Sequence, residues 1–259
     1  MEAGHNELVF ETAALAGEIL VASGAEIFRV TETVQRIAAA YGCPDLEPFV
    51  LSNGLMMTAS DGRQHCLAKV RHIPLSGSRL DRVDAVNQLS REIARGLHTP
   101  AEARARLLEI QVMPGKPRWQ QVLASGVGAG AFCYIFGGTL ADAAAAFVAG
   151  LALYLYLLVA VKGRLSKIAA NITGGALVSL VANLLIWLGL GSQLSMVTVG
   201  AIVPLLPGVA FTNAIRDIAD EDYISGAVRM LDVFLVVVCI AFGVGLAAAG
   251  WAALGGGAQ

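Results

Sequence analysis

The sequence predicts an α+β cytoplasmic domain followed by an all-α membrane domain of five transmembrane helices. Charge is the first observation: residues 1–118 hold 14 of the 20 acidic and 13 of the 18 basic residues. The second is a series of apolar stretches after residue 118, each close to the roughly 20 residues that a membrane-spanning helix needs. We therefore expect a cytoplasmic domain over residues 1–115 and a transmembrane domain over residues 116–259.

Two helices are expected at the start of the chain. Apolar residues recur every three or four positions over residues 8–21 and again over 27–41, where Gly42 follows as a stop. Ser23 and Glu26 are three residues apart and fit a capping box, in which each side chain binds the other's free backbone donor. We prefer this structural role to a catalytic one for both residues.

A small sheet and two further helices complete the predicted first domain. Residues 49–60 and 64–73 are expected as two strands, because Asp61-Gly62 between apolar runs is typical of a hairpin turn. Helices are expected from a cap at Ser78-Arg79-Leu80-Asp81 to about residue 95, and from Thr99-Pro100-Ala101-Glu102 onward.

No motif for catalysis, metal binding or a cofactor is found. His65 and His72 are seven residues apart on one strand and would point to opposite faces of the sheet. Walker-type glycine loops, G-x-S-x-G and H-E-x-x-H are all missing from the sequence. The four cysteines are scattered, which suits small buried side chains in a reducing compartment. The net charge of −2 argues against nucleic-acid binding.

Five apolar stretches are candidate transmembrane helices, at residues 119–138, 139–161, 168–188, 194–214 and 227–251. Lysine and arginine precede the first stretch and occur in the links after the second and the fourth, whereas the opposite links have none. Positive residues stay on the cytoplasmic side, so we expect the N-terminal domain inside and the C-terminus outside. The N-terminus shows no pattern of a cleaved signal.

Small and polar residues in these stretches predict how the helices pack. Gly126 and Gly130 form a G-x-x-x-G pattern, which lets two helices approach closely. Asp142 follows Thr139 by three residues, so we expect it to cap the second stretch. The recurring Asn171, Ser179 and Asn183 either form hydrogen bonds between helices or line a permeation path, and both interpretations stay open.

The fourth stretch is the segment that we expect to organise the function. Pro204 and Pro207-Gly208 interrupt it, because each proline removes a backbone donor and breaks or kinks a helix. Many transporters build their substrate site at such a break, where freed backbone groups line a cavity. The predicted substrate path comprises Asn171, Thr173, Ser179, Asn183, Pro204, Pro207, Gly208, Thr212 and Asn213.

Four charged residues near the fourth and fifth stretches are assigned to proton coupling or gating: Arg216, Asp217, Arg229 and Asp232. Asp217 follows Arg216, and Asp232 comes three residues after Arg229. Each carboxylate therefore forms an ion pair there or is a buried group that changes its protonation during transport.

With these residues in view, the chain resembles the threonine/serine exporter (ThrE) family in its short split form, over almost its full length. The resemblance rests on three segments: ILVASGAEIFRVTETVQRIA, KIAANITGGALVSLVANLL and PLLPGVAFTNAIRDIADEDYISGAVRMLDVFL. It implies a bacterial inner-membrane exporter of small polar metabolites, driven by the proton gradient. It also implies threonine, serine or a dicarboxylate such as succinate as substrate, and a second small membrane subunit that resembles the back half of a fused exporter.

Topology independently favours a partner. An odd number of spans leaves the C-terminus outside, so a related half continuing from there would be inserted upside down, as in many secondary transporters. Two alternatives remain open: a membrane-anchored enzyme whose active part is the cytoplasmic domain, and a regulatory scaffold. Both assign the activity to the cytoplasmic domain rather than to the spans.

Overall fold

The computed structural model describes residues 2–60, 66–74, 77–160 and 165–256. The predicted Asp61-Gly62 turn and His65 lie outside the described residues. Contacts divide the chain into two compact units, which we describe separately: a first unit of residues 1–114 with 208–231, and a second unit of residues 115–207 with 232–259. Residues 208–231 thus group with the N-terminal part of the chain. The sequence analysis had predicted a single domain boundary, at about residue 115.

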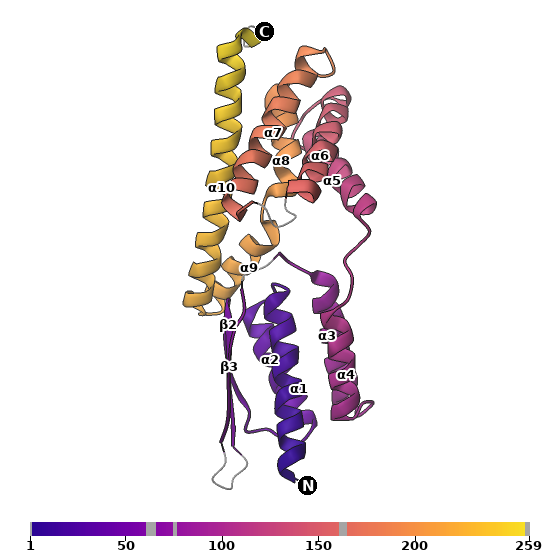
Figure 1. Cartoon of the computed structure of the whole chain (residues 1–259), viewed down its shortest axis with the longest axis vertical. Coiled ribbons are helices and arrows are strands. Elements are labelled where there is room, and N and C mark those ends of the chain that lie inside the picture. The colour runs from indigo at the N-terminus through magenta and orange to yellow at the C-terminus, as the bar shows by residue number, and fades with distance from the viewer. Residues whose placement is uncertain (1, 61–65, 75–76, 161–164, 257–259) are drawn as a thin grey trace. The chain divides into compact units, whose positions relative to one another are not determined.

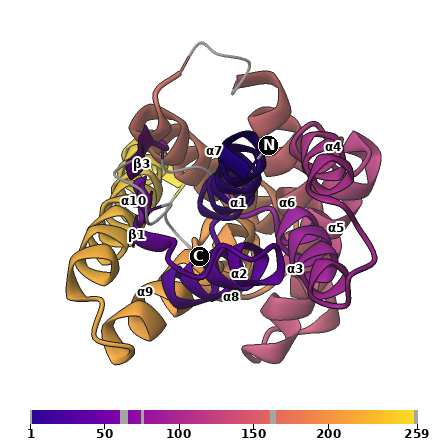
Figure 2. The same cartoon turned by 90° about the horizontal axis from the view of Figure 1, so that it is seen from below.

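The N-terminal part of the first unit has three layers. Its elements are α1 (Glu2–Ala22), α2 (Ile27–Ala40), β1 (Glu47–Leu51), β2 (Gly54–Ser60), β3 (Cys66–His72), α3 (Leu80–Ala94) and α4 (Pro100–Gln111). Helices α1 and α2 lie in the middle, with the sheet on one side and α3 and α4 on the other (Figures 1 and 2). Buried side chains from all three layers form one core, including Leu20, Leu55 and Leu107.

The sheet has three strands, so the prediction of two was wrong. The strands form an antiparallel sheet in the order β1-β2-β3. The predicted first strand is two strands joined by a two-residue turn at Ser52 and Asn53, with Leu51 paired to Gly54. The Asn53-Gly54 dipeptide is a common hairpin signal, but none of residues 52–54 has a positive φ, so the turn here is not the type I′ turn that Asn-Gly favours. The apolar run on either side of this dipeptide obscured it.

The helix caps were predicted with mixed success. Thr99 and Glu102 form the expected capping box at the start of α4. The N-cap of α3 is Arg79, which makes no side-chain cap bond, so the predicted cap at Ser78 was wrong. The capping box at Ser23 and Glu26 was also wrong, because Glu26 makes no cap bond and the Ser23 hydroxyl is buried without a hydrogen-bond partner in the described part of the chain.

The Arg79–Asp81 ion pair should make the stability of the first unit depend on pH. Two hydrogen bonds, of 2.9 and 2.8 Å, join the guanidinium to the carboxylate. Hydrogen bonding to Arg79 lowers the pKa of Asp81 to about 2. A lowered pKa stabilises the fold above the unfolded-state value of about 4, and this contribution disappears as pH falls towards 2.

We therefore expect Asp81→Asn to destabilise the chain by about 1 kcal/mol at pH 6, the size of a half-exposed pair. The difference from the wild type should vanish as pH falls through 4 towards 2. Chemical denaturation of both proteins across this range checks the prediction. A difference that persists unchanged at the acid end would contradict it.

The second unit is helical in its described parts. Its elements are α5 (Arg118–Ile135), α6 (Leu140–Ala160), α7 (Lys167–Trp187), α8 (Leu194–Ile202), the short η1 (Val203–Leu205) and the part of α10 (Tyr223–Trp251) that begins at Asp232, followed by η2 (Ala252–Gly256). Small side chains fill its interior, including Ala146, Ala182 and Ala201. Figure 1 shows α5 to α8 gathered as a bundle.

Glycines allow α5 and α6 to pack closely, which confirms the role predicted for G-x-x-x-G. A Cβ built on Gly130 would lie 2.9 Å from the carbonyl oxygen of Ala143, and one on Gly126 would lie 2.7 Å from Leu151. Gly150 on α6 faces the same contact, 2.6 Å from the methyl group of Ala129. Side chains at these positions would force the helices apart.

The predicted count of five spans is not confirmed. Within the described residues, three helices are long and apolar enough to cross a membrane, or four if a broken pair counts as one span. The three lie at Leu140–Val159, Lys167–Trp187 and Tyr223–Gly255, and the broken pair is Leu194–Leu205 with Gly208–Ala219. Helix α5 is not among them: its Arg118, Gln120 and Gln121 lower the hydropathy of an 18-residue helix.

Two predictions about the ends of these helices are confirmed. The fourth stretch breaks at its prolines: α8 ends at Ile202, Leu206 is extended, and α9 (Gly208–Ala219) begins after Pro207. Asp142 caps α6, accepting hydrogen bonds from the backbone and the hydroxyl of Thr139 at 2.9 and 2.7 Å. Asp142 also accepts bonds from the backbone amides of Ser192 and Gln193, so it anchors the loop before α8.

Candidate functional site

A polar cluster in the first unit joins the loop between α1 and α2 to α9 and the first turns of α10. We define the polar cluster as Glu26, Asn213, Arg216, Asp217 and Arg229, together with the loop of residues 23–26. Four of these five side chains were predicted on sequence grounds to line a path or to couple protons. The structure brings them together on a loop that is about 190 residues away in the chain.

Asp217 is the centre of the polar cluster. Its Oδ1 accepts a hydrogen bond of 3.2 Å from the backbone amide of Ile27 and so caps α2 from another part of the chain. Its Oδ2 lies 3.3 Å from Nε of Arg229. Asp217 is 2% exposed and Arg229 is 5% exposed, so the pair is shielded from water. The partner of Asp217 is therefore Arg229 rather than its neighbour Arg216.

The remaining polar groups bind the backbone of the same loop. Asn213 donates from Nδ2 to the carbonyl oxygen of Gly24 at 2.8 Å, and Arg229 donates from Nη2 to that of Ala25 at 2.7 Å. Arg216 forms an ion pair with Glu26, and Arg29 of α2 binds the same carboxylate at 3.1 Å. The tight αL turn at Gly24, with φ +74, points these carbonyl oxygens towards α9 and α10.

The polar cluster retains unused hydrogen-bonding capacity. The hydroxyls of Ser23 and Ser225 are buried without a hydrogen-bond partner among the described residues, and Oδ2 of Asp217 has only the 3.3 Å ion pair. Buried polar groups without partners are costly, and they gather where a structure has more than one arrangement or a function. Protonation of Asp217 would remove the charge that Arg229 faces and weaken the cap on α2.

Residues of the predicted substrate path lie elsewhere on α7, where they bond within the unit. Asn183 donates to the carbonyl oxygen of Ser179 at 2.8 Å, and both side chains are buried. Thr173 donates to the carbonyl oxygen of Ala169 at 2.6 Å and bonds Tyr156 of α6. Asn171 is half-buried. Interhelical bonding is seen at Thr173, and a role of this stripe in a path remains a prediction.

The broken segment itself is only partly enclosed. Pro204 and Pro207 are half-buried, whereas Gly208 and Thr212 are exposed. The Thr212 hydroxyl bonds back to the carbonyl oxygen of Gly208 at 3.0 Å. Asn213 is 8% exposed, and its side-chain amide donates to the carbonyl oxygen of Gly24. Its predicted contact with a substrate remains untested.

Asp232 forms the ion pair that was one of its two predicted roles, but with a different partner. Both carboxylate oxygens lie 2.7 Å from Nζ of Lys167 at the start of α7. Lys167 is 60% exposed, so this pair is more accessible to solvent than the Asp217–Arg229 pair. It ties α7 to α10 within the second unit, where the sequence offered Arg229 as the neighbouring cation.

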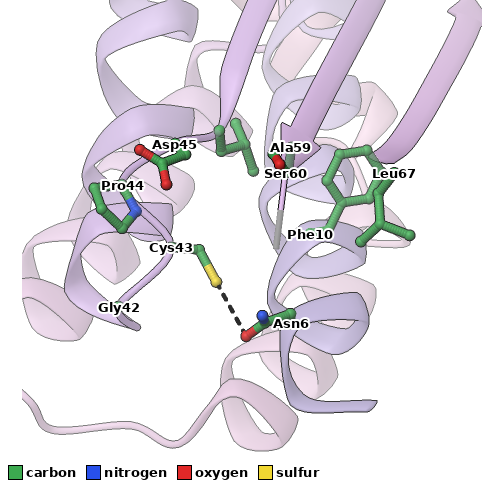
Figure 3. Close-up of a pocket in the computed structure, with 10 residues that line it drawn as sticks. Asn6, Phe10, Gly42, Cys43, Pro44, Asp45, Ala59, Ser60 and Leu67 are labelled. Atoms are coloured by element: carbon green, nitrogen blue, oxygen red, sulfur yellow. Dashed lines mark hydrogen bonds between the residues drawn. The ribbon is translucent and has the colours of Figure 1, made fainter. Parts of the chain in front are cut away.

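A separate pocket of about 190 Å³ opens at the other end of α1. Figure 3 shows Asn6 and Phe10 of α1 facing the loop that carries Cys43 and Asp45, with Leu67 of β3 on the far side. The Cys43 thiol donates to Oδ1 of Asn6 over 3.6 Å. Burial, and then the charge of Asp45, raises the pKa of Cys43. The thiol is therefore protonated at neutral pH.

Sequence reasoning missed several members of these sites. Glu26 was assigned to a cap, Lys167 was used only to orient the helices, and the carbonyl groups of Gly24 and Ala25 were not considered. Of these, only Glu26 could have been predicted from the sequence. It follows Gly24 by two residues, and a carboxylate beside such a glycine turn is available for an ion pair. Among the residues that the structure describes, no three His, Cys, Asp or Glu side chains gather as a metal site would require.

Comparison with known proteins decides the family. The family model ThrE, described as "Putative threonine/serine exporter", matches residues 11–251. This chain belongs to the ThrE family. No curated protein and no solved structure matches it. The ThrE match covers the whole polar cluster and helices α5 to α10, which agrees with a membrane transporter that exports amino acids. The first residues of the pocket in Figure 3, Asn6 and Phe10, precede the ThrE match.

Proposed function

We propose that this chain is a subunit of a secondary exporter that moves small polar metabolites, above all threonine and serine, out of a bacterial cell across its inner membrane. The family description supports this cargo. The distribution of lysine and arginine supports an N-terminal part inside the cell and a C-terminus outside. A second small membrane subunit would supply an inverted half, as in many transporters with internal repeats.

The observation that carries the proposal is the buried Asp217–Arg229 pair in the polar cluster. A buried ion pair is weak evidence for stability alone, since apolar side chains of similar volume often serve as well. The best-attested role of a buried ion pair is to select one conformation of the protein over another. Here the pair holds α9 and α10 on the loop of residues 23–26. We assign it the role of a gate that the proton gradient controls.

The proposed gate works through protonation of a carboxylate. When Asp217 takes up a proton, Arg229 loses its counter-charge and the cap on the first turn of α2 is weakened. The contacts that still hold the loop are then the bonds of Asn213 to Gly24 and of Arg229 to Ala25, and the more exposed Arg216–Glu26 pair. Helix α10 continues without a break from Tyr223 to Trp251. Loss of the ion pair at Arg229 therefore loosens the attachment of the first turns of this long apolar helix.

The charge of the polar cluster favours a zwitterion over a dicarboxylate such as succinate. A dicarboxylate needs cations, and both arginines of the polar cluster already face carboxylates. A zwitterion brings its own counter-charge and can use the hydroxyl, amide and backbone groups around the broken segment. Succinate export therefore remains the second outcome to test.

Efflux from whole cells tests the proposal, because the second subunit is then present. Cells without this chain are loaded with labelled threonine, serine or succinate, and efflux is compared after wild-type, Asp217→Asn or Asp220→Asn protein is restored. Asp220 is exposed and three residues from Asp217, which makes it a matched control. We expect loss of the chain to abolish threonine efflux, D220N to restore it fully, and D217N to restore it at least tenfold less well.

Three results would count against parts of this function. Unchanged efflux without the chain would remove the exporter assignment and favour the enzyme or scaffold alternatives. Full activity and full sensitivity to an uncoupler in D217N would remove the gate but leave the exporter. If succinate efflux depends on the chain and threonine and serine efflux do not, the exported substrate is succinate rather than an amino acid.

A further inference from the structure

The pocket at the start of α1 has a lining suited to one kind of small molecule. Of the residues that line it in the described part of the chain, Asp45 alone carries a charge, and it stands exposed at the mouth. Its other described lining residues are uncharged, with no lysine, arginine or histidine among them. A carboxylate without a nearby cation attracts an ammonium group and repels anions. The described lining thus favours an ammonium group over dicarboxylates and phosphates.

The inner wall supplies the rest of the recognition. The carbonyl oxygen of the Asn6 side chain accepts a weak bond from Cys43, and its second lone pair can accept another donor. The amide nitrogen of Asn6 has no hydrogen-bond partner among the described residues and can donate to a ligand hydroxyl. One turn further along α1, Phe10 lies beside Leu67, and with Ala59 these side chains offer an apolar surface (Figure 3).

The volume limits the size of the ligand. A cavity of about 150 Å³ is enough to bind benzene, which has six carbon atoms. The pocket, at about 190 Å³, therefore holds about six to eight non-hydrogen atoms. So few atoms give weak binding, with a dissociation constant in the millimolar range.

We propose that this pocket binds a small primary amine with one hydroxyl group, the ammonium at Asp45, the hydroxyl at Asn6 and the carbon skeleton against Phe10 and Leu67. Such a ligand joins α1 to the loop between α2 and β1. It binds at one end of α1, whereas the polar cluster lies about 25 Å away at the other end, given 17 residues of helix between Asn6 and Ser23. The site is therefore separate from the proposed gate, and the inference does not depend on export.

Reactivity of Cys43 plays no part in this binding. The thiol is half-buried and neutral and serves as a donor to Asn6. The ligand hydroxyl shares or displaces this weak sulfur bond at Asn6 and forms no covalent link. Binding is therefore reversible and needs no oxidant.

Three probes of nearly equal size separate charge from shape: 2-amino-1-propanol, 1,2-propanediol and lactate. Saturation-transfer NMR titrations of the full chain in detergent give the affinity of each. We expect 2-amino-1-propanol to bind one site per chain in the millimolar range, and the diol and lactate to bind at least fivefold more weakly. Threonine should also bind more weakly than the amino alcohol, because the lining offers no cation for its carboxylate.

Two variants and a control locate the binding. Asp45→Asn should weaken 2-amino-1-propanol about fivefold, the upper value for an exposed charge pair. Asp84→Asn, an exposed carboxylate on α3, should leave it unchanged. Ala59→Leu should fill the pocket and abolish binding, with its melting temperature confirming that the chain is folded.

Equal binding of the diol and the amine would overturn the proposal, as would tighter binding of lactate. So would D45N with unchanged affinity, since Asp45 is exposed and its loss does not endanger the fold. Because the titration measures binding without transport, its failure leaves the exporter assignment intact, and failure of the efflux assay leaves this site intact.

Discussion

Replacement of Arg229 by glutamine is expected to lower the free energy of unfolding by about 3–5 kcal/mol, the usual effect of removing one partner of a buried ion pair. The carboxylate of Asp217 would stay 98% buried and lose the cation 3.3 Å away. The carbonyl oxygen of Ala25 would lose its donor as well. Chemical denaturation of the full chain in detergent, followed by circular dichroism, measures the change.

The double variant R229Q/D217N tests the physical reason. It removes both charges, so it should be more stable than R229Q alone, with an interaction energy of about 1–3 kcal/mol in the double-mutant cycle. Arg216→Gln is the matched control, because its pair with Glu26 is half-exposed and should contribute no more than about 1 kcal/mol. Equal destabilisation by R216Q and R229Q would show that burial does not set these energies.

Hydrogen exchange adds a local readout. Asp217 caps α2 at the amide of Ile27, so the first turn of α2 should exchange faster in D217N. The capping box of α4 at Thr99 should stay protected in the same sample, since it makes its own cap bonds. Global unfolding would instead raise exchange in both helices together.

Local signals in the sequence predicted the elements, and distant contacts decided the site. Thr99, Gly42 and Pro207-Gly208 act on their immediate neighbours, so the start of α4, the end of α2 and the break before α9 could all be predicted. The turn at Ser52 and Asn53, followed by Gly54, carried a local signal too and was overlooked inside an apolar run. The information for the fold was therefore mostly local.

The pairing of charges was beyond the sequence. Each carboxylate was given the nearest cation in the chain, Arg216 for Asp217 and Arg229 for Asp232, whereas the structure pairs Asp217 with Arg229 and Asp232 with Lys167. The cap of α2 failed for the same reason: local spacing favoured Ser23, and a carboxylate 190 residues away took its place. Such pairs depend on which helix faces which, and no short motif records that.

Helix packing in the second unit shows the same limit, and Gly243→Ala is expected to have the largest effect there. The sequence marks both Gly243 and Gly245 as small residues on one helix. Residues two positions apart in a helix point in directions about 200° apart around the helix axis. Only one of these two glycines can therefore face α7. A Cβ built on Gly243 would overlap the carbonyl oxygen of Ile172 and lie 3.0 Å from the amide nitrogen of Ala176. A Cβ built on Gly245 would meet no atom of the described residues within 4 Å, apart from the nearby backbone of α10 itself.

The added methyl group meets backbone atoms of α7, which cannot rotate away as a side chain could. Helix α10 must therefore move off α7, and its contact at Gly175 with the carbonyl oxygen of Ile240 is disrupted too. We expect G243A to destabilise the chain by about 3 kcal/mol, at the upper end for overpacking. Gly245→Ala should be neutral or stabilise by up to about 1 kcal/mol, because alanine favours a helix. Denaturation of both variants in detergent measures these values, and equal effects would mean that α10 does not pack on α7 through Gly243.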